Sequence, residues 1–117
     1  MNVVDLSQKL DGRLGDAKIE EAIQAKGLTA PRVTPEQINA LVDGLTFQTH
    51  RFPGTTSTVA IAVLPNGFVA AVGHSAAARR ENFDAEIGEQ IAISNARTEA
   101  RKKLWELEGY VLKKAIS

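Results

Sequence analysis

The fold is decided by residues 56–73, which read TSTVAIAVLPNGFVAAVG. Val59, Ile61 and Val63 alternate with Ala60 and Ala62, and a period of two is typical of a β-strand. The alternation gives the strand one branched apolar face and one face of small side chains. We therefore expect a helix or a second subunit to pack closely on the alanine face.

A tight turn follows this strand. Pro65 fixes a negative φ, and Asn66-Gly67 supplies the positive φ values that a hairpin turn needs. Residues 68–73 then form the return strand. Residues 45–51 also alternate and form a strand before the hairpin. The sequence therefore predicts an antiparallel meander of about three strands.

Helices precede the predicted meander. Thr34 is a helix N-cap with Pro35 at the first helical position, and Gln37 completes a capping box before the helix ends at Gly44. A weaker pattern of apolar residues at helical spacing predicts an earlier helix over residues 16–27. The two helices are joined by a linker that contains a proline, which prevents their fusion.

A long helix is predicted after the meander. Asn82 is the expected N-cap, and Asp84 is the rival cap. Apolar residues recur at i, i+4 spacing as far as Lys113, which gives a length of about 45 Å at 1.5 Å per residue. That length exceeds the width of a domain of this size. We therefore expect either a break near Gly88 or Gly109, or a protrusion into an oligomer.

These elements predict an α+β fold, in which a short antiparallel meander of about three strands packs against a long C-terminal helix, with N-terminal helices. Residues 1–30 are expected to form a helical arm, and residues 31–117 a single α+β domain. A three-stranded sheet leaves edges exposed, and one helix covers little of it. We therefore expect a homo-oligomer, either a dimer or a trimer of dimers.

Composition narrows the classes of function. The chain has 117 residues, no cysteine, and 14 acidic against 14 basic residues. Disulfides and thiolate chemistry are therefore excluded, and bulk attraction to nucleic acid is not expected. No signal peptide or membrane span is predicted, so we expect a cytoplasmic protein. The two histidines have no companion ligands at metal spacing, and no catalytic motif is present, so we expect no metal, no cofactor and no catalysis.

Three separated motifs resemble one known family. They are Asn66-Gly67-Phe68, the segment NFDAEIG at residues 82–88 and the segment LWELEGYVL at residues 104–112. The resemblance spans roughly residues 34–113 and is to a family of small phage proteins named after gene forty-nine of a lytic coliphage and gene sixty-six of a Shigella phage. The chain differs from the family pattern at His74 and at residues 77–80, beside the presumed ligand site.

That family is similar to the anti-Thoeris sponges, small β-α phage proteins that bind cyclic ADP-ribose-type signals and related cyclic nucleotides without cleaving them. The resemblance implies a non-catalytic sponge in the cytoplasm of an infected bacterial cell. Its ligand would be a cyclic nucleotide signal of the host's antiphage defence. Sequestering that signal would keep the defence effector inactive.

A nucleotide sponge needs an aromatic face for the base and cationic or amide donors for the phosphates. Each candidate also has a structural interpretation: a phenylalanine after a turn is often core, an asparagine can cap a helix, and basic residues often line a solvated face. The long helix could instead supply a phosphate clamp reached across a subunit interface. The candidate ligand-binding residues are Phe68, His74, Arg79, Arg80, Asn82, Asn95, Arg97 and Arg101.

Two other classes of function remain open from the sequence. The first is an accessory factor that docks on a host or phage protein through residues 1–30 or through the sheet edge. The second is nucleic-acid binding by the basic stretch of the long helix, which is weaker because the net charge is zero. A docking factor needs an exposed apolar patch of several hundred Å², whereas a sponge needs an enclosed basic pocket, which we expect near Phe68 and Arg79.

Overall fold

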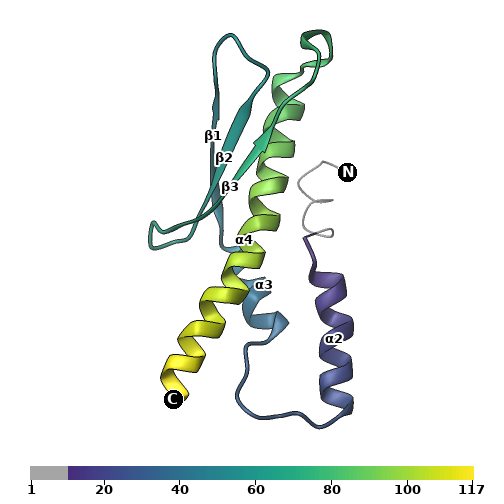
Figure 1. The fold of residues 1–117 in the computed structure, drawn as a ribbon, viewed down its shortest axis with the longest axis vertical. Coiled ribbons are helices and arrows are strands. Elements are labelled where there is room, and N and C mark those ends of the chain that lie inside the picture. Colours follow the sequence, from purple (N-terminus) through teal and green to yellow (C-terminus); the bar gives the residue numbers. More distant parts are fainter. Residues whose placement is uncertain (1–10) are drawn as a thin grey trace.

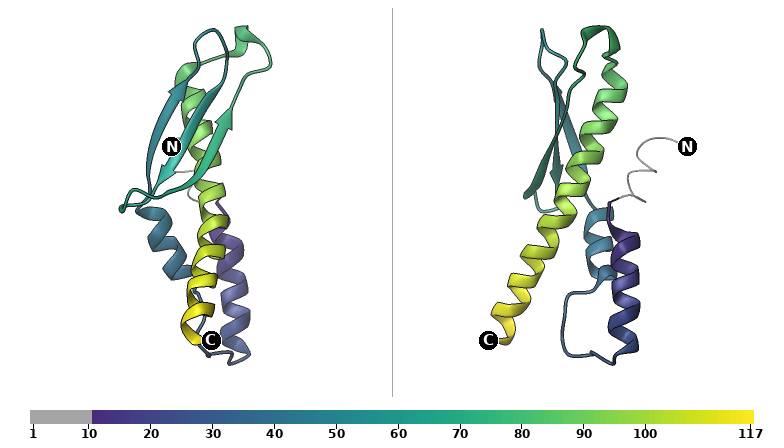
Figure 2. Two further views of the ribbon diagram at one scale, coloured as in Figure 1. Left: turned by 60° about the vertical axis from the view of Figure 1, so that its left-hand side comes forward. Right: turned by 45° about the vertical axis from the view of Figure 1, so that its right-hand side comes forward.

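The computed structural model describes residues 11–117 (Figure 1). Its elements follow the order α2 (Arg13–Ala25), α3 (Pro35–Asp43), β1 (Thr46–Arg51), β2 (Thr58–Val63), β3 (Val69–Ser75), the short 3₁₀ helix η1 (Arg80–Asn82) and α4 (Ala85–Ile116). The strands form an antiparallel sheet in the order β1-β2-β3, and α4 runs along one face of it (Figure 2). The predicted α+β fold is confirmed. Residues 1–10 of the predicted N-terminal arm lie outside the described residues.

Small side chains let α4 lie close to the sheet. Ala60 of β2 pairs with Gly73 of β3, and Ala60 and Ala62 have no exposed surface. A Cβ atom built on Gly73 would lie 2.3 Å from the amide nitrogen of Ala96 in α4. This backbone-to-backbone approach is possible only without a side chain. The expectation that a helix or subunit packs on the alanine face is confirmed, and the element is α4.

The helix α4 is a single unbroken element of 32 residues. Asp84 is its N-cap, because the carboxylate accepts a hydrogen bond from the amide of Ile87 at 3.0 Å. The prediction that Asn82 caps this helix was therefore wrong: Asn82 belongs to η1, whereas Asp84 has the extended backbone of a cap. Neither Gly88 nor Gly109 breaks α4, whose C-terminal part extends beyond the sheet (Figure 1).

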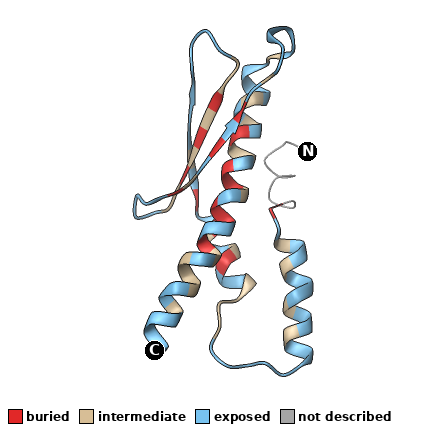
Figure 3. Cartoon of the chain, in the orientation of Figure 1, coloured by how far each residue is buried: buried red, intermediate tan, exposed pale blue. Residues whose placement is uncertain are grey.

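The buried core lies where α4 crosses the sheet and meets α3 (Figure 3). Most of its members are small, so the core is thin and depends on close approach rather than on large side chains. No helix in residues 11–117 has the length and hydropathy that a membrane crossing requires. The buried apolar residues are Ile38, Val42, Leu45, Ala60, Ala62, Ala70, Ala92, Ala96, Ala100 and Leu104.

Polar contacts hold α2 against the rest of the chain. None of its residues is buried. Its Asp16 carboxylate accepts hydrogen bonds from Arg101 Nε and Nη2, at 3.1 and 2.7 Å, and from Trp105 Nε1 at 3.1 Å. Farther along α2, Glu20 pairs with Arg32 of the linker. The position of α2 therefore depends on charged hydrogen bonds more than on apolar burial.

Candidate functional site

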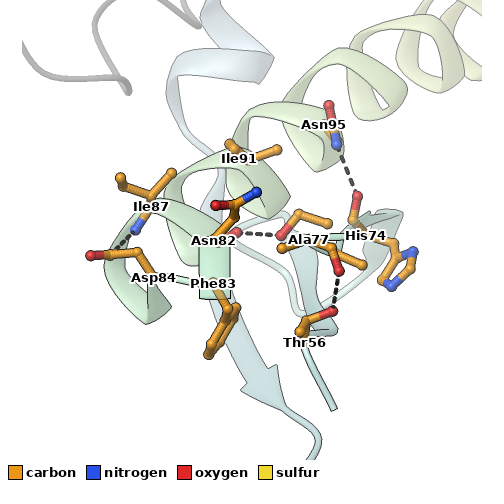
Figure 4. A pocket seen from close by; sticks show the side chains of 12 residues that line it. Thr56, His74, Ala77, Asn82, Phe83, Asp84, Ile87, Ile91 and Asn95 are labelled. Atoms are coloured by element: carbon orange, nitrogen blue, oxygen red, sulfur yellow. Dashed lines mark hydrogen bonds between the residues drawn. The ribbon is translucent and has the colours of Figure 1, made fainter. Parts of the chain in front are cut away.

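A cleft of about 380 Å³ lies where the C-terminal end of β3 meets the N-terminal end of α4 (Figure 4). We call it the hinge cleft. The end of β3 and the neighbouring loops form one side, and Phe83 together with Ile87 and Ile91 of α4 forms the other. The volume is within the range of small-molecule sites. The cleft is lined by Thr56, His74, Ser75, Ala76, Ala77, Asn82, Phe83, Asp84, Ile87, Gly88, Ile91 and Asn95.

Hydrogen bonds between side chains and backbone fix the walls of the hinge cleft. Asn95 Nδ2 donates to the carbonyl of His74 at 2.9 Å, and Ser75 Oγ donates to the carbonyl of Gly88 at 2.6 Å. Both bonds join β3 to α4 (Figure 4 shows the first). The strand end and the helix therefore form a rigid frame around the cleft, as a preorganised binding site requires.

A second cleft of about 270 Å³ adjoins the first and shares Thr56 and Phe83 with it. We call it the arginine cleft; its other lining residues are residues 51–55 and Arg80. The guanidinium carbon of Arg51 lies 5.9 Å from the ring centre of Phe83. Arg80 Nη2 donates to the carbonyl of Gly54 at 3.3 Å. Phe83 thus lines both clefts, and the exposed residues Arg51 and Arg80 line the arginine cleft with it. This arrangement suits an anionic ligand with a flat ring system.

The other ionisable groups of the hinge cleft already have partners. The Asp84 carboxylate accepts from the amide of Ile87. The imidazole Nε2 of His74 is hydrogen-bonded to Ser57 Oγ at 3.0 Å. Both side chains therefore have structural partners, and the positive charge of the arginine cleft is that of Arg51 and Arg80.

The structure brings four of the sequence-predicted ligand residues to these clefts. His74, Asn82 and Asn95 line the hinge cleft, and Arg80 lines the arginine cleft. Asn82 is exposed at the end of η1 and is free of the capping role expected for it. These four residues come from the consecutive elements β3, η1 and α4.

Two other predicted residues lie elsewhere on the surface. Arg79 is exposed beside Arg80 and forms an ion pair of 3.2 Å with Glu81, outside both clefts. Phe68 is half exposed at the turn between β2 and β3. It precedes β3, whereas His74 lies near the end of that strand, so Phe68 does not share a cleft with His74 or Arg80 within one protomer.

The last two predicted residues, Arg97 and Arg101, are buried on α4. Arg101 pairs with Asp16 at 2.7 Å and is 3.9 Å from the carboxylate of Asp11. The guanidinium carbon of Arg97 lies 4.9 Å from the ring centre of Phe47. Burial lowers the pKa of the Arg97 guanidinium, and the nearby carboxylates offset this effect only in part. Neither residue lines either cleft, so they do not form a clamp with Arg80 in the protomer.

Sequence reasoning missed Phe83, Arg51 and Thr56 as cleft residues. Phe83 has i, i+4 spacing from Ile87, and Ile87 from Ile91, which favours a place on the helix, but Phe83 precedes the cap and lies outside α4. Arg51 could have been found from its position in the strand. It lies four residues after Phe47, and residues an even number apart share one face of a strand, here the face of β1 that is turned toward α4. The β1–β2 register, in which Arg51 pairs with Thr58, fixes that face.

The fold and the clefts define a small α+β protein with a candidate site for an anionic aromatic ligand. The chain belongs to the Phage protein (N4 Gp49/phage Sf6 gene 66) family, whose profile matches residues 33–116. The matched region runs from α3 to the end of α4 and includes both clefts. No curated protein and no solved structure matches the chain.

Proposed function

We propose that this phage protein is a non-catalytic sponge for a cyclic nucleotide or cyclic ADP-ribose-type immune signal. The observation that supports the proposal is Phe83, which lines two adjoining clefts and has the guanidinium of Arg51 5.9 Å from its ring centre, with Arg80 lining the same cleft as Arg51. Membership of the phage family and the resemblance of that family to anti-Thoeris sponges point to the same class of ligand. The protein would act in the cytoplasm of the infected host cell.

The chemistry of the clefts matches the parts of such a ligand. A base can stack on Phe83, since base–aromatic stacking is worth about 1–3 kcal/mol. Phosphate oxygens can accept hydrogen bonds from Arg51 and Arg80, whose guanidinium groups are exposed in the arginine cleft. Ribose and amide groups can bond to Asn82 in the hinge cleft. The phosphate clamp in this proposal therefore uses Arg51 and Arg80, and the buried Arg97 and Arg101 support the fold.

Binding without turnover is proposed because the acid and base groups of the hinge cleft are structurally engaged. Asp84 caps α4, and His74 is bonded to Ser57. Inhibition of the defence would then be stoichiometric. The protein must reach the concentration of the signal, and its affinity must exceed that of the host effector.

Equilibrium dialysis against cyclic dinucleotides, cyclic trinucleotides and cyclic ADP-ribose isomers tests the site. Arg80→Ala should weaken retention by about 10- to 150-fold, because each charge-assisted hydrogen bond is worth about 1.5–3 kcal/mol. Arg79→Ala is the matched control, since it removes the same charge from the neighbouring residue outside both clefts. If Arg79→Ala abolishes retention while Arg80→Ala preserves it, the assignment of the clefts is wrong.

A further inference from the structure

A third cleft, of about 280 Å³, lies between α2 and the rest of the chain and shares no residue with the hinge cleft or the arginine cleft. One wall is a single side of α2, formed by two carboxylates and two isoleucines at i, i+3 and i, i+4 spacing. The other wall comes from the linker, the start of α3 and α4. We call this second wall, with the adjacent Arg101, the tryptophan surface; its residues are Arg32, Val33, Pro35, Arg101 and Trp105.

The apolar part of the contact between α2 and the tryptophan surface is incompletely packed. Ile19 lines the third cleft, yet it is 62% exposed, and no residue of α2 is buried. The backbone of α2 comes close to α3 but not to α4, which α2 reaches only through side chains (Figure 2). Burial of apolar surface therefore contributes little to the position of α2.

The polar part of this contact is complete and has the same polarity throughout the third cleft. Asp16 of α2 accepts hydrogen bonds from Arg101 and Trp105, and Glu20 accepts two from Arg32. The carboxylates are thus on α2, and the N–H donors are on the tryptophan surface. Arg101 is only 2% exposed with α2 in place, so this surface requires a carboxylate from whatever covers it.

The two walls of the third cleft also differ in their relation to the family. The profile matches residues 33–116, which include Trp105, Arg101 and all of α3 and α4. The helix α2 precedes the matched region. The family domain therefore carries most of the tryptophan surface, and the helix that covers it is an additional element.

We propose that the tryptophan surface is a docking site for an acidic amphipathic helix of another protein, and that α2 is a displaceable occupant of this site. The side of α2 that meets the surface defines the partner. It has carboxylates at Asp16 and Glu20, at positions i and i+4, and isoleucines at i+3 and i+7. Helices that bind in grooves are anchored at these same four positions, and the donors of the surface select a negatively charged partner.

A partner helix displaces α2 by filling the space that α2 leaves open. Larger apolar side chains at the positions of Ile19 and Ile23 can occupy the third cleft, and carboxylates at the positions of Asp16 and Glu20 keep Arg101 and Arg32 paired. Docking at this surface is separate from the proposed nucleotide site, because the third cleft shares no residue with the other two. Either proposal can therefore fail without the other.

Fluorescence anisotropy of a labelled synthetic peptide with the sequence of residues 12–27, added to the full chain, tests displacement. The wild-type chain should bind the peptide weakly, because its own tethered α2 competes at an effective concentration of about 1 mM. Asp16→Ala in the chain should strengthen peptide binding at least about tenfold, since its own α2 loses charge-assisted hydrogen bonds. Glu21→Ala is the matched control: it removes an exposed carboxylate of α2 outside the third cleft and should bind the peptide as the wild type does.

A second peptide tests the chemistry of the partner. A peptide that carries both Asp16→Ala and Glu20→Ala should bind the Asp16→Ala chain at least about tenfold more weakly than the peptide of natural sequence. Equal binding of the two peptides would show that the carboxylates do not select the partner. Equal binding, or failure of the Asp16→Ala chain to bind either peptide, would overturn the proposal.

Hydrogen exchange of the wild-type chain tests displacement without a substitution. The amides of α2 should exchange at least about 100-fold faster than those of residues 92–104 in α4, because a displaceable helix opens while the core remains folded. If the two sets of amides exchange at the same rate, α2 leaves only when the whole chain unfolds, and the proposal fails.

Discussion

Replacing Gly73 by alanine tests the closest contact in the fold. The added methyl carbon would lie 2.3 Å from the carbonyl oxygen of Ala92 and 2.3 Å from the amide nitrogen of Ala96. Ordinary carbon contacts begin near 3.5 Å, so β3 and α4 would have to separate by about 1 Å. Both obstructing atoms belong to the backbone, so no side chain can rotate away to relieve the clash.

The cost of this separation follows from the packing between α4 and the sheet. Five fully buried alanines line it, and burial of their methyl groups contributes about 4 kcal/mol at about 0.8 kcal/mol each. A gap of about 1 Å forfeits roughly a quarter to a half of such contacts, and overpacking adds about 1–3 kcal/mol of strain. We therefore expect Gly73→Ala to lower the free energy of unfolding by about 2–5 kcal/mol.

Urea denaturation followed by circular dichroism measures this loss. Gly109→Ala is the matched control: it lies in α4, and no atom lies within 4 Å of an added Cβ. Helix propensity alone should make Gly109→Ala more stable by about 0.5–1 kcal/mol. A loss of less than about 0.5 kcal/mol in Gly73→Ala, within the range of ordinary surface changes, would refute the close packing of β3 on α4.

Three further changes test the cap, the attachment of α2 and the site. Asp84→Ala should lower the free energy of unfolding by about 1 kcal/mol because α4 loses its N-cap. The control Asn82→Ala should change that free energy by less than about 0.5 kcal/mol, and equal losses for the two variants in urea denaturation would contradict the cap assignment. Asp16→Ala should lower the free energy of unfolding by about 3 kcal/mol because the buried Arg101 loses its closest carboxylate. It should also shift the fluorescence of the single tryptophan, Trp105, which loses its hydrogen bond to Asp16; an unchanged emission spectrum would contradict this contact. Phe83→Ala should weaken nucleotide retention by about 5- to 150-fold in equilibrium dialysis through loss of stacking, and undiminished retention would remove the ring from the site.

Local patterns were enough to predict the sheet and the presence of the long helix. The alternation in residues 56–73 predicted β2, the turn and β3, and the alanines predicted close packing on one face. The choice between Asn82 and Asp84 as cap was not decided by residue type, because both are good capping residues. It depended on the short turn η1, which ends at Asn82 and is held by hydrogen bonds from the amides of Asn82 and Phe83 to the carbonyls of Arg79 and Arg80.

The site was only partly predictable because it is formed by separate elements whose packing no local pattern gives. His74, Asn82 and Asn95 meet in the hinge cleft because β3 and α4 are antiparallel neighbours. The cation beside Phe83 comes from Arg51, on the other edge strand, and no local pattern joins these two residues. The buried positions of Arg97 and Arg101 were also not visible in the sequence, since their partners lie on β1 and α2.

Native mass spectrometry of the purified protein, alone and mixed with cyclic dinucleotides, cyclic trinucleotides and cyclic ADP-ribose isomers, tests the proposed function most directly. We predict a mass shift by one of these ligands and its release, chemically intact, after heating. Release of a cleaved ligand would contradict sequestration and identify an enzyme. The absence of a mass shift with every nucleotide would contradict the sponge itself and favour a factor that docks on another protein.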